Sequence, residues 1–279
     1  MRLLSIETGY FKCDGGALFS VVPKVMWSKQ VKADVNNLVT CSMRCLLVID
    51  GERKILIDAG AGDKYDDKFK RNNGLHGEDT LAGSLQKAGF QPEEITDVVF
   101  THLHWDHCNG AVKYAANGTG LELLFPNATH WASAAQWENS HNANPREGNA
   151  YMLSDLDVFE KSGKLKLIDQ EGFLFPNFEI RIFNGHTPGM MVPIIHTECC
   201  SVVFAADLFP VSANVPPTWL ASYDLYPVTA MEEKAGFLKE AFDKNWILFF
   251  EHDKNIECAE VEQTEKGLKA GRIYQLKEL

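Results

Sequence analysis

The sequence predicts an α/β protein whose short apolar strands end directly in front of polar side chains that can bind metal. Three observations lead to this prediction. An apolar run at residues 97–100 is followed by three histidines and one aspartate within six positions. Four other apolar runs are also followed, within three residues, by a carboxylate or a histidine. Segments of helical periodicity alternate with these runs, and strand ends of an α/β sheet are where ligand sites are usually built.

In the first half of the chain, short strands are predicted by alternating apolar residues or by apolar runs between turn signals. They cover residues 3–8 (an edge strand), 41–50, 54–57, 97–101, 121–125 and 128–131. Asp50-Gly51 predicts a hairpin turn between the second and third of these strands. Helices are expected over 79–88, over 133–139 and just after Gly110. Residues 61–78 are expected to form a surface loop, and 140–163 an insertion near the site.

The second half continues the same pattern. Strands are predicted over residues 165–168, 178–183, 201–206 and 246–250. Thr229 and Glu232 form a capping box that predicts a helix running to about residue 243, and a last helix is expected over 256–267. The sequence shows no repeat with a period of about 20–50 residues. We therefore expect residues 1–279 to form a single domain made of two similar halves.

Composition restricts the classes of partner. The chain has 45% hydrophobic and 23% charged residues, which is ordinary for a globular protein, and a formal net charge of -11. This charge makes nucleic acid a poor partner. No window approaches the ~18 apolar residues of a membrane span, and the N-terminal residues lack the apolar segment of a secretory signal. Seven cysteines without a CxxC pair fit reduced thiols, so we expect a cytoplasmic protein with no membrane partner.

The cluster at residues 102–107 predicts metal binding. In an extended segment, His102, His104 and Asp106 would point to one side and His107 to another. A single ion cannot take all four groups at this spacing, whereas two neighbouring ions can share them. Three histidines and a carboxylate so close together are therefore better explained by a two-metal site than by ordinary core or surface histidines.

Three residues farther along the chain complete the ligands for two ions. The first ion would be held by His102, His104 and His186, the second by Asp106, His107 and His252, with Asp207 bridging them. This set suits two Zn²⁺, with manganese or iron as alternatives. Two cations about 3.5–4 Å apart lower the pKa of a shared water. We therefore expect hydrolysis by a bridging hydroxide, with Asp106 also catalytic because it can orient the hydroxide and pass its proton to the leaving group.

Other candidates have both a structural and a functional interpretation. Asp58 either caps a turn or holds a ligand in place. Tyr223 could hydrogen-bond a substrate oxygen as a catalytic residue, and so could Tyr226, or both could pack in a lid. Cys108 is expected to pack beneath the site rather than act as a nucleophile. The remaining histidines are expected to be surface or core residues: His76, His130, His141 and His196.

The pattern resembles the metallo-β-lactamase superfamily: H-x-H-x-D-H at 102–107, then His186, Asp207 and His252, with Asp58 upstream. The resemblance implies a four-layer αβ/βα sandwich of two mixed sheets flanked by helices, with a dimetal site at one edge. Segments 14–19, 22–28 and 222–227 are similar to the quorum-quenching N-acyl-homoserine lactonase branch. The chain departs from that branch at Pro210, where relatives carry a tyrosine, so Tyr223 could replace it only if its loop folds back. Met190 stands where many relatives carry histidine, at a position that binds no metal.

The leading hypothesis is a dinuclear zinc hydrolase that opens a lactone or ester, with N-acyl-homoserine lactone as a candidate substrate. Thioester or phosphotriester hydrolysis could use the same residues, and a mononuclear iron dioxygenase is an alternative from another class. We expect a small-molecule substrate as the partner and leave a homodimer open.

Overall fold

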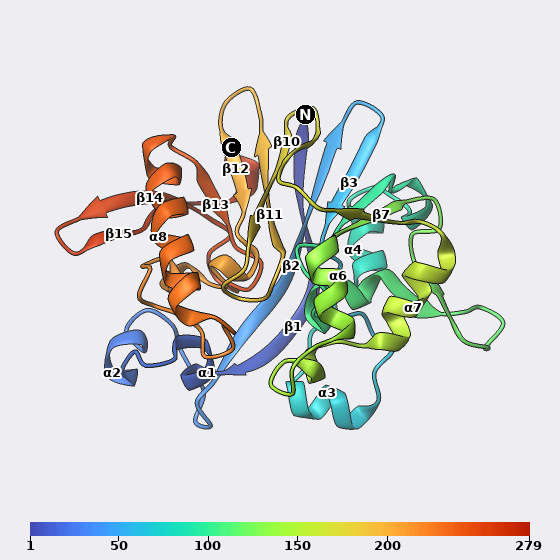
Figure 1. Ribbon diagram of the computed structural model, residues 1–279, viewed down its shortest axis with the longest axis horizontal. Coiled ribbons are helices and arrows are strands. Elements are labelled where there is room, and N and C mark those ends of the chain that lie inside the picture. Colours follow the sequence, from blue (N-terminus) through green and yellow to red (C-terminus); the bar gives the residue numbers. More distant parts are fainter. The chain divides into compact units, whose positions relative to one another are not determined.

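The computed structural model describes residues 1–279. The chain divides into two compact units: unit 1 comprises Met1–Tyr10 and Met43–Gln170, and unit 2 comprises Phe11–Ser42 and Glu171–Leu279. The chain forms mixed β-sheets together with helices (Figure 1), which confirms the predicted α/β class. The expectation that the whole chain forms a single domain of two similar halves stays a prediction.

The large sheet that runs through unit 1 has the strand order β1-β2-β3-β4-β7-β8. The strands are β1 (Arg2–Asp14), β2 (Leu38–Asp50), β3 (Arg53–Ile57), β4 (Asp97–Val99), β7 (Thr129–Ser133) and β8 (Leu165–Ile168). The predicted edge strand is β1, and the predicted hairpin joins β2 to β3 through Gly51, whose φ of 58° suits a tight turn. Strands β3, β4, β7 and β8 run parallel, so their carboxyl ends share one edge of the sheet.

Helices and a small hairpin complete unit 1. They are α3 (Asp67–Asn73), α4 (Leu81–Lys87), α5 (Trp105–Cys108), α6 (Ala134–His141), α7 (Leu153–Ser162), β5 (Val112–Tyr114), β6 (Leu121–Leu123) and the short 3-10 turns η1 (Pro92–Glu94), η2 (Asn109–Ala111) and η3 (Gly148–Ala150). Leu85 of α4 and Phe159 of α7 are fully buried in one core with Val98 of β4. Their burial explains why these helices cover the sheet.

Two local predictions in unit 1 were wrong, and a third segment contains a helix that was not predicted. Residues 61–78, expected to be a loop, contain α3, and residues 140–163, expected to be an insertion near the site, contain α7, whose Leu156 and Phe159 are buried three positions apart on one face. The helix expected after Gly110 is absent: a single 3-10 turn leads into the β5–β6 hairpin. Gly110 N donates to Gly60 O, a tertiary contact that local sequence does not reveal.

The sheet of unit 2 has the strand order β15-β14-β13-β12-β11-β10-β9. The strands are β9 (Gly172–Phe175), β10 (Phe178–Phe183), β11 (Met190–His196), β12 (Ser201–Phe204), β13 (Ile247–Phe249), β14 (Cys258–Thr264) and β15 (Gly267–Tyr274). Only the β12–β13 pair is parallel. The helices are α1 (Gly15–Phe19), α2 (Lys24–Trp27) and α8 (Pro227–Asp243), with 3-10 turns η4 (Ala206–Leu208), η5 (Ser212–Asn214) and η6 (Leu276–Glu278).

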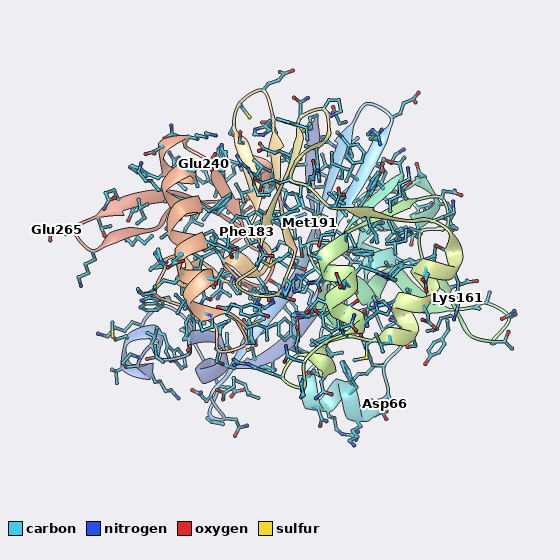
Figure 2. The ribbon with its side chains drawn as sticks, viewed as in Figure 1. Asp66, Lys161, Phe183, Met191, Glu240 and Glu265 are labelled. Atoms are coloured by element: carbon cyan, nitrogen blue, oxygen red, sulfur yellow. The ribbon has the colours of Figure 1, made fainter.

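Helix α8 packs on the sheet of unit 2. Phe237 meets Phe183 of β10 edge to face at 5.3 Å, and Glu240 pairs with Arg181 of the same strand at 3.1 Å (Figure 2). The helix begins at Pro227, two residues before the predicted capping box, because proline suits the first helical position. No helix of the structure combines the length and the apolar composition needed to cross a bilayer.

The last helix, expected over residues 256–267, is wrong. These residues form the β14–β15 hairpin, in which Thr264 pairs with Gly267, and Glu265 in the turn points away from the sheet (Figure 2). Cys258 of β14 pairs with Phe249 of β13, and both are fully buried. Pairing with a neighbouring strand therefore overrides the helical propensity of this glutamate-rich segment.

His130 of β7 lies in the core of unit 1. Its imidazole packs against the rings of Phe100 and Phe159, at centroid distances of 6.0 Å and 5.3 Å. Burial lowers the pKa of His130 to about 4. The unfolded chain therefore binds this proton more readily than the folded protein does, so the free energy of unfolding falls as the pH falls from about 6.5 to about 4.

Between pH 7 and pH 4 the free energy of unfolding of the original chain should fall by up to about 3 kcal/mol because of His130. In His130→Leu this contribution to the decrease is expected to be absent. Denaturant unfolding at a series of pH values measures this change. Phe159→Leu is the matched control, because it leaves a cavity in the same core without removing a titrating group and should keep the pH slope of the original chain. An unaltered slope in His130→Leu would contradict the assignment.

Candidate metal centre

Unit 1 gathers four of the predicted ligands at the end of β4. The rings of His104 and His107 lie 4.4 Å and 3.9 Å from that of His102, and Asp106 Oδ2 lies 3.8 Å from His107 Nε2. The alternation of polar side chains predicted an extended segment, but only its first part is extended. His104 is the N-cap of α5, so Asp106 and His107 lie on a single helical turn that directs both toward the same group of side chains.

Asp58 fixes two of these histidines. It follows β3, the neighbour of β4, and its buried carboxylate accepts hydrogen bonds from Thr101 N and Thr101 Oγ1, both at 2.7 Å, and pairs with His107 Nδ1 at 3.0 Å. The Thr101 hydroxyl therefore has its proton toward Asp58 and accepts from His102 Nδ1 at 3.1 Å. Both histidines are thus set to present Nε2 to a metal. Asp58 therefore orients two of the predicted ligands, which agrees with one of its two expected roles.

Glu147 fixes His104. Its Oε1 lies 3.0 Å from His104 Nε2, so the atom that His104 can offer to a metal is Nδ1. Glu147 is itself held by the Tyr151 hydroxyl at 2.6 Å and by Asn139 Nδ2 at 2.9 Å. It lies between α6 and α7, within the segment expected to be an insertion near the site. Sequence reasoning missed Glu147 itself, because one glutamate in an irregular loop carries no spacing signal.

Unit 2 gathers the other three predicted ligands. His186 follows β10, Asp207 lies in η4 after β12, and His252 follows β13. Asp207 Oδ2 lies 3.3 Å from His186 Nε2, and Oδ1 lies 3.0 Å from His252 Nε2. One carboxylate thus faces two imidazoles, with one oxygen toward each. This is the arrangement that a carboxylate shared by two metal ions requires.

The two histidines of unit 2 are oriented in the same way as those of unit 1. His186 Nδ1 lies 3.0 Å from Asp224 Oδ1, and Asp224 Oδ2 accepts from Ala221 N at 3.0 Å. His252 Nδ1 donates to the carbonyl oxygen of Ser42 at 2.8 Å. Metal-binding histidines usually have their second ring nitrogen fixed by an oxygen acceptor. All five histidines of the predicted ligand set meet this condition, so the residues present fit divalent metal ions.

The backbone just before His186 packs tightly against helix α8. A Cβ on Gly185 would lie 2.3 Å from Ala230 Cα on α8, so only glycine fits there. Glu233 of the same helix accepts hydrogen bonds from Asn184 N at 2.8 Å and Gly185 N at 2.9 Å. Helix α8 therefore fixes the loop that carries His186.

Of the two candidate tyrosines, Tyr223 lies at the ligands. Its ring stands perpendicular to that of His186 at 5.7 Å, so the loop does fold back onto this histidine, whereas Tyr226 is 49% exposed. Burial raises the pKa of Tyr223 well above its ordinary value. The hydroxyl therefore stays protonated and can donate a hydrogen bond.

Cys108 is fully buried next to His107, and its thiol donates to Leu103 O at 3.4 Å. Burial raises the pKa of this thiol well above its ordinary value. A thiol with a raised pKa is a poor nucleophile, which agrees with the expected packing role of Cys108.

Two of the other histidines also make structural contacts. His76 packs against Tyr10, and His196 pairs with Glu179 at 3.0 Å.

Replacing Asp58 by asparagine is expected to lower the affinity of the full chain for zinc by about 10- to 100-fold. Asparagine tolerates the left-handed backbone at this position, where φ is 57°. Its side chain, however, replaces one carboxylate oxygen by an NH₂ group, which cannot accept a hydrogen bond from His107 Nδ1. Zinc titration against a chelator of known affinity measures the change.

Asp97→Asn is the control for Asp58→Asn. Asp97 is also a buried carboxylate of unit 1, but it binds Arg53 at 3.1 Å and Trp131 Nε1 at 2.9 Å and contacts none of the predicted ligands. Its replacement should lower stability and leave zinc affinity unchanged. Equal losses of zinc affinity in both variants would show that Asp58 acts through general stability alone.

Comparisons with known proteins agree with this description. The family model described as "Metallo-beta-lactamase superfamily" matches residues 41–252, a range that contains all seven predicted ligands. An N-acyl homoserine lactonase of Bacillus cereus is 26% identical over 254 residues, covering 85% of this chain and 88% of that protein. An N-acyl homoserine lactonase of Bacillus thuringiensis is 24% identical, covering 78% and 83% of the two chains.

Two solved structures share the fold. A probable metal-dependent hydrolase from Staphylococcus aureus superposes with a TM-score of 0.89 at 27% identity, covering 98% of this chain and 95% of that one. AidC, described as a dizinc quorum-quenching lactonase in complex with a product, superposes with a TM-score of 0.81 at 24% identity, covering 98% and 94%. The second likeness bears on the fold alone.

Proposed function

Because the chain belongs to the metallo-beta-lactamase superfamily of metal-dependent hydrolases, we propose that it is a dinuclear zinc hydrolase that opens lactone rings. The predicted resemblance, the fold and the assignment as an enzyme are thereby confirmed. The number and identity of the ions and the lactone substrate belong to the proposal. So does the assembly of the ligands of unit 1 and unit 2 into one centre.

The observation that carries the proposal is the orientation of the histidines. Each has one ring nitrogen held by an oxygen acceptor, which supports a metal-binding role for the other nitrogen. The two oxygens of Asp207 face one histidine each, which supports a shared ligand and hence two ions rather than one. Zinc suits this set of imidazoles and carboxylates, with manganese or iron as alternatives.

When bound, two divalent cations supply an activated water and a positive charge that stabilises the oxygen of the attacked carbonyl. The chain's own residues then have distinct tasks. Asp106, on the helical turn of α5, would accept the proton of the attacking water and pass it to the ring oxygen that leaves. Tyr223, whose hydroxyl stays protonated, would donate a hydrogen bond to a substrate oxygen beside His186.

Lactones are proposed as the substrate class because relatives that cover most of the chain are named N-acyl homoserine lactonases. On this basis an N-acyl-homoserine lactone is the first substrate to test, with quorum quenching as the biological outcome. Thioesters, phosphotriesters and an iron-dependent dioxygenation are the alternatives from the sequence. No contact in the structure favours one of them, and a homodimer also stays untested.

The test joins metal analysis to a panel of substrates. Protein purified without added metal is expected to contain about two zinc ions per chain, and to convert an N-acyl-homoserine lactone into the ring-opened acid with release of one proton. Asp106→Asn should abolish most of this activity. Full metal loading without turnover of any lactone would refute the substrate class, and about one iron per chain with oxygen uptake would refute the hydrolase assignment. Near-normal turnover by Asp106→Asn with both ions bound would refute its role in proton transfer.

A further inference from the structure

The turn that joins β11 to β12 carries two adjacent cysteines that the proposed reaction does not use. The Sγ atoms of Cys199 and Cys200 lie 3.7 Å apart. Cys199 is exposed and Cys200 half-buried, whereas four of the other five cysteines are buried and Cys13 is half-buried. The turn lies in unit 2 beside the C-terminal end of the chain, where Cys199 Sγ approaches Leu279 O at 3.4 Å (Figure 1).

Thr197 organises the two thiols. Its backbone N donates to Cys200 O at 2.9 Å, and its hydroxyl oxygen accepts from Cys200 N at 3.2 Å. Two hydrogen bonds therefore join the first and last residues of the turn. The same hydroxyl lies 3.2 Å from Cys199 Sγ and 3.7 Å from Cys200 Sγ. Hydrogen bonds from Thr197 and Cys200 lower the pKa of the Cys199 thiol, whereas burial raises that of Cys200. Cys199 is therefore the thiol that ionises first.

The spacing disfavours a disulfide between these residues. Consecutive Cα atoms are about 3.8 Å apart, whereas disulfides usually join residues whose Cα atoms are about 4.4–6.8 Å apart. Chelation has no such difficulty. A soft ion bound by two thiolates at about 2.3 Å with tetrahedral angles needs sulfur atoms about 3.8 Å apart, close to the 3.7 Å observed.

We propose that Cys199 and Cys200 form a chelating site for thiophilic trivalent ions, represented by organic arsenicals with one carbon substituent. Thiolates select soft ions of this kind. The pair supplies two sulfur ligands. A trivalent arsenical with one carbon substituent has two ligand positions left to fill, whereas a structural zinc ion needs four ligands.

The binding reaction balances without an oxidant. Phenylarsine oxide reacts with the two thiols to form two arsenic–sulfur bonds, and its oxygen leaves as water with the two thiol protons. Arsenic keeps its oxidation state. The turn immediately precedes Ser201, the first residue of β12, whereas Asp207 lies beyond the last residue of that strand. The thiol pair is therefore at the other end of β12 from the metal-binding carboxylate.

The test is intact-mass spectrometry of the zinc-loaded full chain after treatment with phenylarsine oxide. We expect one phenylarsenic group per chain, bound with loss of water, that survives an excess of a monothiol and is removed by 2,3-dimercaptopropanol. Cys199→Ser and Cys200→Ser should each weaken binding by about 100-fold or more, because the second sulfur adds to the first at high effective concentration.

Cys13→Ser is the matched control, because Cys13 is the other partly exposed cysteine outside the turn, and this variant should bind like the original chain. A stable adduct in either serine variant of the pair, or its loss in Cys13→Ser, would overturn the proposal. Ready closure of a Cys199–Cys200 disulfide by glutathione disulfide, seen as a loss of two hydrogens, would also overturn it. None of these outcomes depends on hydrolytic activity.

Discussion

Replacing Asp207 by asparagine is expected to lower kcat/KM for an N-acyl-homoserine lactone by more than about 100-fold. This loss exceeds the loss of about 10- to 100-fold that is typical when a residue that only orients a metal ligand is replaced. One oxygen of Asp207 faces His186 Nε2 at 3.3 Å and the other faces His252 Nε2 at 3.0 Å. An asparagine side chain keeps one oxygen, and its neutral NH₂ group binds neither a metal ion nor the proton of a water. The variant should therefore also bind less zinc, which elemental analysis measures independently of the substrate.

A graded series of carboxylates in unit 2 separates this effect from a general loss of charge. Asp224, which holds His186 Nδ1 at 3.0 Å, should give an intermediate loss of about 10- to 100-fold when replaced by asparagine. Asp243, at the exposed end of α8 and paired with Lys239, should give none. An Asp207→Asn variant that keeps full zinc content and full turnover would exclude a bridging role for this carboxylate.

Replacing Lys64 by methionine is expected to destabilise the protein by about 3–5 kcal/mol, because it leaves a buried carboxylate without its cation. Lys64 Nζ pairs with Asp155 Oδ2 at 2.7 Å, and their side chains are 6% and 3% exposed. The ammonium also donates to Val112 O at 3.1 Å and to Asn109 O. The ion pair thus joins α7 and the loop after β3 to the backbone that follows the histidine cluster. Chemical denaturation measures the change in the free energy of unfolding.

The double variant Lys64→Met/Asp155→Leu should recover most of that loss. Burial raises the pKa of Asp155 even beside the ammonium, so the pair is not strongly favourable over apolar side chains. The control lies on the same helix: Lys161 and Asp157 form an exposed pair at 2.8 Å, and Lys161→Met should change stability by less than about 1 kcal/mol (Figure 2). If the double variant were as unstable as Lys64→Met, the cost would lie in lost packing rather than in the unpaired charge.

The sequence was sufficient to identify side chains that the structure brings together in each unit, because the predicted ligands follow apolar strands. His102, His186 and His252 each come shortly after a strand that carries buried apolar residues, and parallel pairs such as β12–β13 bring strand ends to one edge of a sheet. This relation between strand ends and sites follows from general geometry and does not require knowledge of the surrounding loops. The grouping of the predicted ligands within each unit could therefore be anticipated before any tertiary contact was known.

The residues that orient those ligands could not be found in the same way. Glu147, Asp224 and the Ser42 carbonyl each contact a histidine between 38 and 210 positions away in the chain, with no fixed spacing. The final hairpin was also missed, because its residues permit a helix in isolation and form strands only beside β13. Both failures have the same physical origin: long-range contacts decide them, and local composition does not record such contacts.

The loop between α6 and α7 has a consequence for engineering. Loops of this kind are the usual places to change when a scaffold is given a new substrate, because they tolerate insertion and carry little of the core. Here, however, Glu147 of that loop holds His104, and Asn139 and Tyr151 hold Glu147. Libraries that shorten or randomise the loop would alter the support of this predicted ligand along with substrate preference. Libraries that keep these three residues and Asn144, whose Oδ1 accepts from Glu147 N at 3.3 Å, would leave the exposed positions Asn142 and Pro145 open to variation.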